Sequence, residues 1–451
     1  MGEDQHTDHI RLEITYRQIL QIALPISFAL VVPQFNFLTN SYFLSKLGKG
    51  YLGAAGITGV YYLIFAVIGY GLNNGLQSLI SRRAGQGRVQ DIGKLFAQSI
   101  YLSLIIAGIG ILFTWVFAPL LFRKTVEPSL AELSIRFLRI RIWGLPFLYF
   151  YQMRNALLVG TNQSKFLIWG TLAETLSNIF LDYALIFGKF GFPQLGFNGA
   201  AYASIGAEII GMATVFLIIW IKNMHTRFRL FHDLGFDRTE IKLLLDQSVP
   251  LILQYGISIF TWEIFFIMIS HHGILALDIS QFMRVVISFC GIFAWSYAST
   301  ANTMVANVIG QGKQHLVMTL IHRIQWLSMG IMFIFFLALQ LMPGTFLALV
   351  RDDPDFIKLG IPVLRVVATA LLLMSFSTVW MNSVTGTGNS KITLGIELIT
   401  LSLYLIYIYL VLEKWDLSIT WGWGSEILYW ISMFSMSYTY LKRFNWQKKY
   451  L

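Results

Sequence analysis

The chain has 451 residues, of which 56% are hydrophobic and 12% are charged, and its mean hydropathy is +0.64. Soluble domains carry about 25% charged residues, so the composition excludes an ordinary soluble protein and predicts an integral membrane protein. The net charge of +10 would suit a nucleic-acid partner, but the placement of the basic residues decides against that interpretation.

Apolar runs of about 20 residues, the length that crosses a bilayer, occur twelve times. The predicted spans are residues 18–45, 52–80, 95–118, 134–158, 166–187, 199–220, 247–270, 276–306, 316–341, 358–383, 392–411 and 421–441. With both termini in the cytoplasm, most Lys and Arg residues of the connecting segments lie on the inner side, as the positive-inside rule requires. The positive charge is thus explained by topology, and we expect no nucleic-acid partner. The first seventeen residues lack an apolar core, so we also expect no cleavable signal peptide.

A polar stripe runs through the fifth predicted span. Glu174, Asn178 and Asp182 recur every fourth residue, which places them on one face of a helix. An ionisable group at membrane depth costs at least a few kcal/mol unless it faces a cavity or a partner. The stripe is therefore a candidate functional site, although a buried polar pair that fixes helix packing would give the same pattern.

The two halves of the chain resemble each other. An offset of 225 residues aligns Pro25 with Pro250 and Gly48 with Gly273, and it aligns Gly85-Gln86-Gly87-Arg88 with Gly310-Gln311-Gly312-Lys313. At an offset of 226 the match continues, with Gly160-Thr161 on Gly386-Thr387. Because each half holds six spans, the repeats have the same orientation in the membrane. We predict an N-terminal lobe at 1–221, a cytoplasmic linker at 222–242 and a C-terminal lobe at 243–451. Asp237 and Glu240 form a capping-box pattern, so a helix should start there.

The fifth and sixth spans also carry a resemblance to a known family. Its residues are Asn178, Asp182, Ile186-Phe187-Gly188, Pro193, Leu195-Gly196 and Gly199-Ala200-Ala201. In this order they resemble the signature of the multidrug and toxic compound extrusion (MATE) transporters, in particular their DinF-like branch. The resemblance extends from about Arg17 to Arg443. It implies an all-α integral membrane fold of twelve transmembrane helices in two six-helix lobes related by a parallel internal repeat.

The resemblance also implies a cation or proton site in the first lobe. Carried over to this chain, its residues are Asp182, Asn178, Asn40, Ser204 and the carbonyl of Ala200. Asn40 departs from the family, which usually has a carboxylate there. An amide coordinates a cation through its oxygen but does not take up or release a proton, so the coupling ion, H⁺ or Na⁺, stays open.

Other acidic residues also lie within the predicted spans. Glu263 in the seventh span is a possible second acidic site, and structural pairing is an equally good explanation of it. For Glu174, Glu208 and Glu397, hydrogen bonding between helices is the favoured role. His271-His272 has no third ligand nearby in sequence, so we expect no metal site.

The function implied by the resemblance is secondary active efflux of drugs and organic cations, in antiport with protons or sodium ions. Such a transporter is not an enzyme and needs no ATP site or cofactor. The resemblance further implies a monomer in the bacterial inner membrane, with both termini cytoplasmic. One alternative is a lipid-linked oligosaccharide flippase of the same superfamily, which usually needs a strongly cationic cavity. A membrane enzyme is a third class, and the sequence contains no catalytic signature for one.

Overall fold

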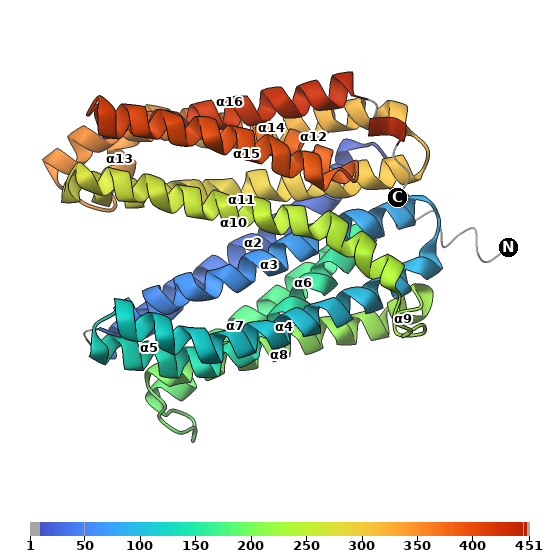
Figure 1. Ribbon diagram of the computed structural model, residues 1–451, viewed down its shortest axis with the longest axis horizontal. Coiled ribbons are helices and arrows are strands. Elements are labelled where there is room, and N and C mark those ends of the chain that lie inside the picture. The colour runs from blue at the N-terminus through green and yellow to red at the C-terminus, as the bar shows by residue number, and fades with distance from the viewer. Residues whose placement is uncertain (1–9, 49, 445, 449–451) are drawn as a thin grey trace. The chain divides into compact units, whose positions relative to one another are not determined.

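The computed structural model describes residues 10–48, 50–444 and 446–448, and all of its regular elements in these ranges are helices (Figure 1). The helices of the first half are α2 (Tyr16–Ser45), α3 (Tyr51–Gly85), α4 (Val89–Thr125), α5 (Pro128–Arg141), α6 (Leu145–Gly160), α7 (Leu167–Phe187), α8 (Phe197–Ile221) and α9 (Met224–Arg227). Those of the second half are α10 (Arg238–His271), α11 (Ile274–Gly310), α12 (Val317–Leu341), α13 (Pro343–Ala348), α14 (Pro354–Gly386), α15 (Ser390–Ile408) and α16 (Ile419–Arg443).

The helices agree with the predicted spans. Nine helices of the described ranges are long and apolar enough to cross a membrane. The fourth predicted span is divided into α5 and α6 by a short 3₁₀ turn at Ile142–Gly144. Pro146, in the first turn of α6, explains the break, because proline has no N–H to continue the helical hydrogen bonding. The remaining two spans are α7 and α16, which carry polar residues along their length.

The internal repeat is visible in the backbone. Gly87 and Gly312 follow α3 and α11, and both have φ of 74°. Gly48 and Gly273, which precede α3 and α11, also have positive φ values, 119° and 100°. Glycine reaches this region without the steric cost of a Cβ atom. The two copies of the repeat therefore begin and end this helix with the same backbone conformation.

Helix packing divides the chain into two compact units. Unit 1 contains Leu24–Ser248, and unit 2 contains Arg11–Ala23 together with the chain from Val249 onward. Both limits fall inside helices, so the first turns of α2 pack in unit 2 and the start of α10 packs in unit 1. The division into an N-terminal lobe at 1–221, a cytoplasmic linker at 222–242 and a C-terminal lobe at 243–451 stays a prediction.

The two prolines of the internal repeat lie where the chain passes between the units. Pro25 and Pro250 lie inside α2 and α10, directly after the residues at which each helix passes from one unit to the other.

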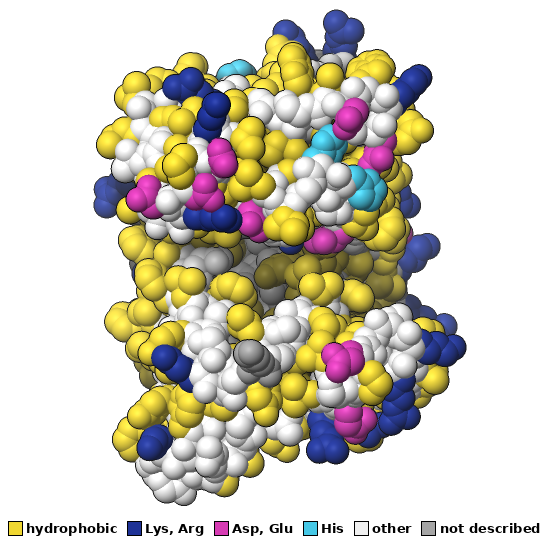
Figure 2. Space-filling model, turned by 90° about the vertical axis from the view of Figure 1, so that its left-hand side faces the viewer, with side chains coloured by type: hydrophobic (Ala, Val, Ile, Leu, Met, Phe, Trp, Pro, Cys, Tyr) yellow, Lys and Arg dark blue, Asp and Glu magenta, His cyan; other side chains and the backbone are white. Residues whose placement is uncertain are grey.

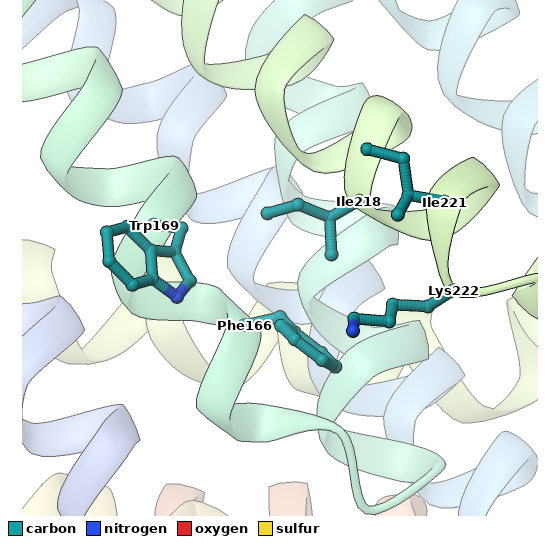
Figure 3. A pocket seen from close by; sticks show the side chains of 5 residues that line it. All are labelled: Phe166, Trp169, Ile218, Ile221 and Lys222. Atoms are coloured by element: carbon teal, nitrogen blue, oxygen red, sulfur yellow. The ribbon is translucent and has the colours of Figure 1, made fainter.

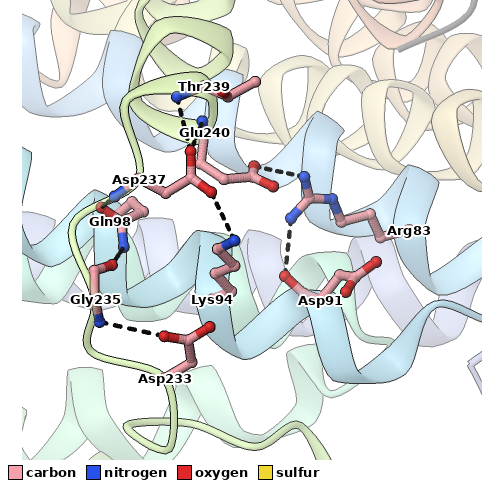
Figure 4. A network of polar contacts seen from close by, with 9 residues as sticks. All are labelled: Arg83, Asp91, Lys94, Gln98, Asp233, Gly235, Asp237, Thr239 and Glu240. Carbon is pink, nitrogen blue, oxygen red and sulfur yellow. Dashed lines mark hydrogen bonds and ion pairs between the residues drawn. The ribbon is translucent and has the colours of Figure 1, made fainter.

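Ionic contacts fix the start of α10 on unit 1 (Figure 4). Lys94 Nζ lies 2.6 Å from Asp237, and Arg83 Nη2 lies 2.6 Å from Glu240. Asp237 Oδ1 accepts the Glu240 N–H at 3.2 Å, so the predicted N-cap forms. The Glu240 side chain does not return to the Asp237 N–H, because that N–H donates to Gln98 Oε1 at 3.1 Å. The capping box is thus half formed, and its second carboxylate pairs with Arg83.

Each unit has its own apolar core. In unit 1 one cluster surrounds Ile142 and Tyr149, and a second one surrounds Leu44, Ile186 and Ala200. Many large apolar side chains are exposed, among them Phe37 at 70%, which suits contact with lipid. Charged side chains gather at the ends of helices. Figure 2 shows such an end, where histidines lie close to acidic side chains, and the pair His271 and Glu413 of unit 2 are 2.8 Å apart.

Candidate functional site

Two polar residues of the α7 stripe are buried inside unit 1. Asp182 is 0% exposed and Asn178 is 2% exposed, in a helix that packs closely against α8. Neither carboxylate oxygen of Asp182 has a hydrogen-bond partner, and neither does Asn178 Oδ1. A buried acceptor without a donor costs about 1–3 kcal/mol, and a charged acceptor costs more. These oxygen atoms therefore need a proton, a cation or water.

A glycine brings α7 and α8 close together at this level. A Cβ atom on Gly199 would lie 2.7 Å from the carbonyl oxygen of Leu185, so only glycine permits the approach. The preceding hairpin is fixed by Gly188, which ends α7 with φ of 66°, and by the Leu195 N–H, which donates to Leu185 O at 2.8 Å. The hairpin thus determines which residues of α7 and α8 face each other.

An aromatic and aliphatic contact fixes α2 beside them. The Phe43 ring lies 5.8 Å from that of Phe187. Leu44, Ile186 and Ala200 belong to one buried cluster contributed by α2, α7 and α8. This cluster sets the relative register of the three helices.

The register brings three predicted site residues to one level. Asn40, Asp182 and Ser204 each lie four residues, about one helical turn, from Leu44, Ile186 and Ala200 respectively. The turn leads in the same direction in all three helices, because α8 runs opposite to α2 and α7. Asn40 Oδ1 is buried without a hydrogen-bond partner, like the Asp182 oxygens. Three of the sequence-predicted residues of the first lobe therefore lie at one level of α2, α7 and α8, with Ala200 one turn away in the apolar cluster.

One further amide was missed at the sequence level. Asn36 precedes Asn40 by one turn on α2, and its Oδ1 is also buried without a partner. The spacing of four residues between two amides in an apolar span was the available signal. Asn198, in the first turn of α8, has the same unpaired oxygen.

Glu263 lies in the other unit. Its side chain is 51% exposed, and its Oε1 accepts from Arg284 Nη2 at 3.0 Å. The Arg284 guanidinium also lies over the Phe266 ring, at 3.9 Å. Glu263 therefore forms a structural ion pair with Arg284. Its role as a second acidic site stays a prediction.

Two other features do not resemble a functional site. A shallow groove of about 270 Å³ lies between α7 and α8 (Figure 3), and its lining residues are Phe166, Trp169, Ile218, Ile221 and Lys222. Trp169 is thirteen residues from Asp182, about 20 Å along α7, so the groove is separate from the polar stripe. Within the described residues there is no group of three His, Cys, Asp or Glu side chains that could hold a metal ion.

Comparison with known proteins identifies the family. The MatE family model matches residues 25–184 and, a second time, residues 250–410. The chain belongs to the MATE family. The two matches start 225 residues apart, at Pro25 and Pro250, as the internal repeat predicts. Proteins of this family are transporters rather than enzymes.

Individual relatives agree with this assignment. A probable multidrug resistance protein NorM of Synechocystis is 28% identical over 375 residues, which are 79% of each chain. A solved MOP-superfamily transporter from Pyrococcus furiosus, described as having a binding pocket of reversed polarity, is 18% identical and has a TM-score of 0.86 over 98% of this chain and 99% of its own. A MATE transporter solved in an outward-facing conformation has the same identity and TM-score, over 97% and 98% of the two chains. The predicted fold of twelve helices in two six-helix lobes is thereby confirmed.

Proposed function

We propose that this MATE protein is a secondary active antiporter that exports organic, often cationic small molecules in exchange for protons or sodium ions. The observation that carries this proposal is the Asp182 carboxylate, which is fully buried in a membrane span with no hydrogen-bond partner for either oxygen. An uncompensated carboxylate is too costly there. It is stable when a proton or a cation occupies it, and this requirement links ion binding to the conformation of the surrounding helices.

Asn40, Asn178 and Ser204 complete the proposed coupling site. They offer neutral oxygen atoms beside a single carboxylate, with Ala200 one turn away on α8. Hard cations favour oxygen ligands, and the number of charged ligands tunes the affinity. With one carboxylate only, the site suits a proton or a weakly bound sodium ion. We place the protein in the DinF-like branch on the same first-lobe residues, although the named relatives are NorM proteins.

The proposal also covers the membrane location, the oligomeric state and the substrate of the protein. We propose a monomer in the bacterial inner membrane with both termini in the cytoplasm, in line with the distribution of Lys and Arg. The substrate would be a small organic molecule, as the names of the relatives suggest. No cofactor other than the coupling ion is required by this mechanism.

The test is transport of ethidium, a fluorescent organic cation, by purified protein in proteoliposomes with an imposed proton or sodium gradient. Asp182→Asn keeps the size of the side chain but cannot exchange a proton, so gradient-driven accumulation of ethidium should be lost. Asp278→Asn is the matched control, because Asp278 is exposed and paired with Arg351 at 3.2 Å. Equal accumulation by the Asp182→Asn variant and the wild type would refute the assignment.

A further inference from the structure

Besides Asp182, unit 1 contains a group of four charged side chains that interact with one another electrostatically. They are Arg141, Arg154, Glu174 and Glu208, which come from α5, α6, α7 and α8. The coupling site described above uses none of them. Their hydrogen bonding divides them into one complete ion pair and one incomplete pair.

The complete pair is Arg141 with Glu208. Both oxygen atoms of Glu208 accept from the guanidinium, at 2.5 and 3.1 Å. The guanidinium also lies 4.1 Å from the centre of the Tyr62 ring. Gly144 leaves room for the pair, since a Cβ atom there would lie 2.2 Å from Arg141 Nη1. This bidentate pair is saturated, which is what a buried ion pair requires to be stable.

The incomplete pair is Arg154 with Glu174. Arg154 is 0% exposed, and its Nη1 donates to the carbonyl oxygen of Gly211 at 2.8 Å. Its Nε and Nη2 have no hydrogen-bond partner, and Glu174 Oε2 has none either. The favoured sequence interpretation, a hydrogen bond from Glu174 to another helix, therefore fails for this oxygen.

Two glycines bring the Arg154 and Glu174 side chains to one place beside α7 and α8. A Cβ atom on Gly211 would lie 3.2 Å from Glu174 Oε2, and a Cβ atom on Gly170 would lie 2.6 Å from Arg154 Nη1. Gly211 thus contacts both side chains, the carboxylate through its Cα side and the guanidinium through its carbonyl. The two glycines thus make room for the two side chains, which leave unsatisfied donors on Arg154 and an unsatisfied acceptor on Glu174. Water is the smallest group that satisfies both.

Glu174 also lies in line with Asp182. Eight residues separate them on α7, about 12 Å, and Asn178 lies halfway on the same face. One turn beyond Glu174 in the other direction, Thr171 Oγ1 and the Tyr151 hydroxyl are 3.3 Å apart. Polar groups therefore follow one face of α7 through much of its length. Rows of ionisable groups inside membrane proteins commonly carry protons.

We propose that Glu174 is a second proton-carrying carboxylate, which exchanges a proton with Asp182 through water held beside Arg154. The proposal rests on the proposed function of Asp182. In the transfer, the O–H bond of the protonated Asp182 breaks and an O–H bond forms on the Glu174 carboxylate, while Asp182 becomes a carboxylate. The total charge of unit 1 is unchanged by this step. Arg154 balances the Glu174 carboxylate whenever the proton has left it.

The groups that surround Glu174 fit this role. Glu174 interacts electrostatically with Arg154 of α6, Tyr70 of α3, Arg141 of α5 and Glu208 of α8. The Tyr151 ring of α6 lies 4.2 Å from the Arg154 guanidinium. The charge of Glu208 is cancelled by its own pair with Arg141. Glu174 is thus the one of the two glutamates whose charge is left for Arg154 to balance. The Glu208 carboxylate is held by two hydrogen bonds from Arg141. Glu174 has no such bonds at Oε2, so a proton can bind to that oxygen and leave it again.

The experiment combines infrared spectroscopy and transport. The pH-dependent C=O stretch of protonated carboxyl groups is recorded on full-length protein in detergent, and ethidium accumulation is measured in proteoliposomes under a proton gradient. Glu174→Gln should remove one titrating band, keep ethidium binding and lose gradient-driven accumulation. Glu174→Asp should restore both the band and part of the accumulation. Glu397→Gln is the matched control, because Glu397 is buried in unit 2 and accepts from Tyr429 and Gln254 at 2.6 and 3.4 Å.

The outcomes separate this proposal from the function on which it rests. If Asp182→Asn abolishes coupling while Glu174→Gln leaves the bands and the pH profile unchanged, the relay is wrong and the coupling site stands. A lower thermal stability as the single effect of Glu174→Gln also overturns the relay, because a structural residue would behave so. If Asp182→Asn transports normally and Glu174→Gln does not, Glu174 is the coupling carboxylate itself and both assignments are wrong.

Discussion

Asn40 is the residue that decides the charge of the proposed coupling site. Replacing it by aspartate adds a second carboxylate at the level of Asp182, so the two would titrate as a coupled pair. We expect Asn40→Asp to strengthen the sodium dependence of ethidium export, or to move its pH dependence upward. The measurement is the initial transport rate against sodium concentration at several pH values.

The control for this prediction is Asn198→Asp, which adds the same charge in the first turn of α8. The wild-type protein also tests whether the neutral side chain of Asn40 weakens ion binding. If its transport saturates at low sodium concentration and ignores pH, the neutral side chain of Asn40 does not weaken the site. The interpretation of Asn40 would then have to be abandoned.

Gly199 is a residue whose effect reaches the helix pair α7 and α8. Gly199→Ala places a methyl group 2.7 Å from Leu185 O, so the start of α8 must move. Overpacking of this kind costs about 1–3 kcal/mol, and the movement also displaces Ser204 from the level of Asp182. We expect lower thermal stability in detergent together with weaker coupling.

Gly108→Ala on α4 is the matched control for Gly199, because a Cβ atom there has nothing within 4 Å. It should leave both stability and coupling close to those of the wild type. Equal melting temperatures for the two variants would show that the close approach of α7 and α8 does not depend on Gly199.

At the scale of elements, the contacts at the start of α10 make a contribution to folding stability that depends on pH, and the direction of this dependence follows from Asp237. The hydrogen bond from Lys94, followed by those from the N–H groups of Glu240 and Thr239, lowers the pKa of Asp237 from 3.8 to about 2. A carboxylate whose pKa is lower in the folded than in the unfolded protein stabilises the fold at pH values above its unfolded-state pKa. This contribution is therefore complete at neutral pH and is lost as the pH falls from about 4 to about 2.

The test compares melting temperatures of the wild type and Asp237→Asn across this acidic range. The difference between the two proteins should be constant above pH 5 and shrink below pH 4, because protonation removes from the wild type what the substitution has removed already. Asp233→Asn is the control, since the Asp233 side chain is near Lys94 but bonds the Gly235 N–H. A difference that does not change with pH would exclude the Lys94 and Asp237 contact as its source.

The elements were largely predictable from sequence, and the reasons are physical. Apolar runs of membrane-spanning length must form helices, since no other open structure satisfies the backbone in lipid. The start of α10 could be placed because Asp237 is a good N-cap. The pairing of Glu240 with Arg83, and the absence of a partner for Glu174, depend on which helices become neighbours. Local patterns do not contain that information.

The candidate site was predictable for a different reason. Asp182 and Asn178 stand out because polar residues are costly in a span, and the hairpin at Gly188 is visible as a turn. Asn40 and Ser204 entered through a family resemblance, and the apolar cluster around Leu44 supplies the physical reason for their alignment. The role of Arg154 could not be predicted from sequence, because its complete burial with two unpaired nitrogens depends on which helices surround it.

At the scale of the whole molecule, the chain passes between the two units inside α2 and α10. The segment before α2 is fixed to unit 2, where the Leu12 N–H donates to Asn307 Oδ1 at 3.0 Å and Gln311 donates to Leu12 O at 3.0 Å. The start of α10 is fixed to unit 1 through Glu240 and Asp237. Each helix thus has its two ends in different units, and any relative movement of the units must bend it.

Pro25 and Pro250 lie where this bending has the least resistance. Each removes one helical hydrogen bond, so the helix is weakest beside it. We expect Pro25→Ala with Pro250→Ala to straighten and stiffen both helices, which raises the melting temperature and slows gradient-driven ethidium export. Pro33→Ala is the control, because Pro33 lies in α2 but within unit 1. Stiffening at Pro33 should leave the transport rate nearly unchanged, whereas equal slowing by all three substitutions would mean that general helix flexibility, and not the passage between units, limits transport.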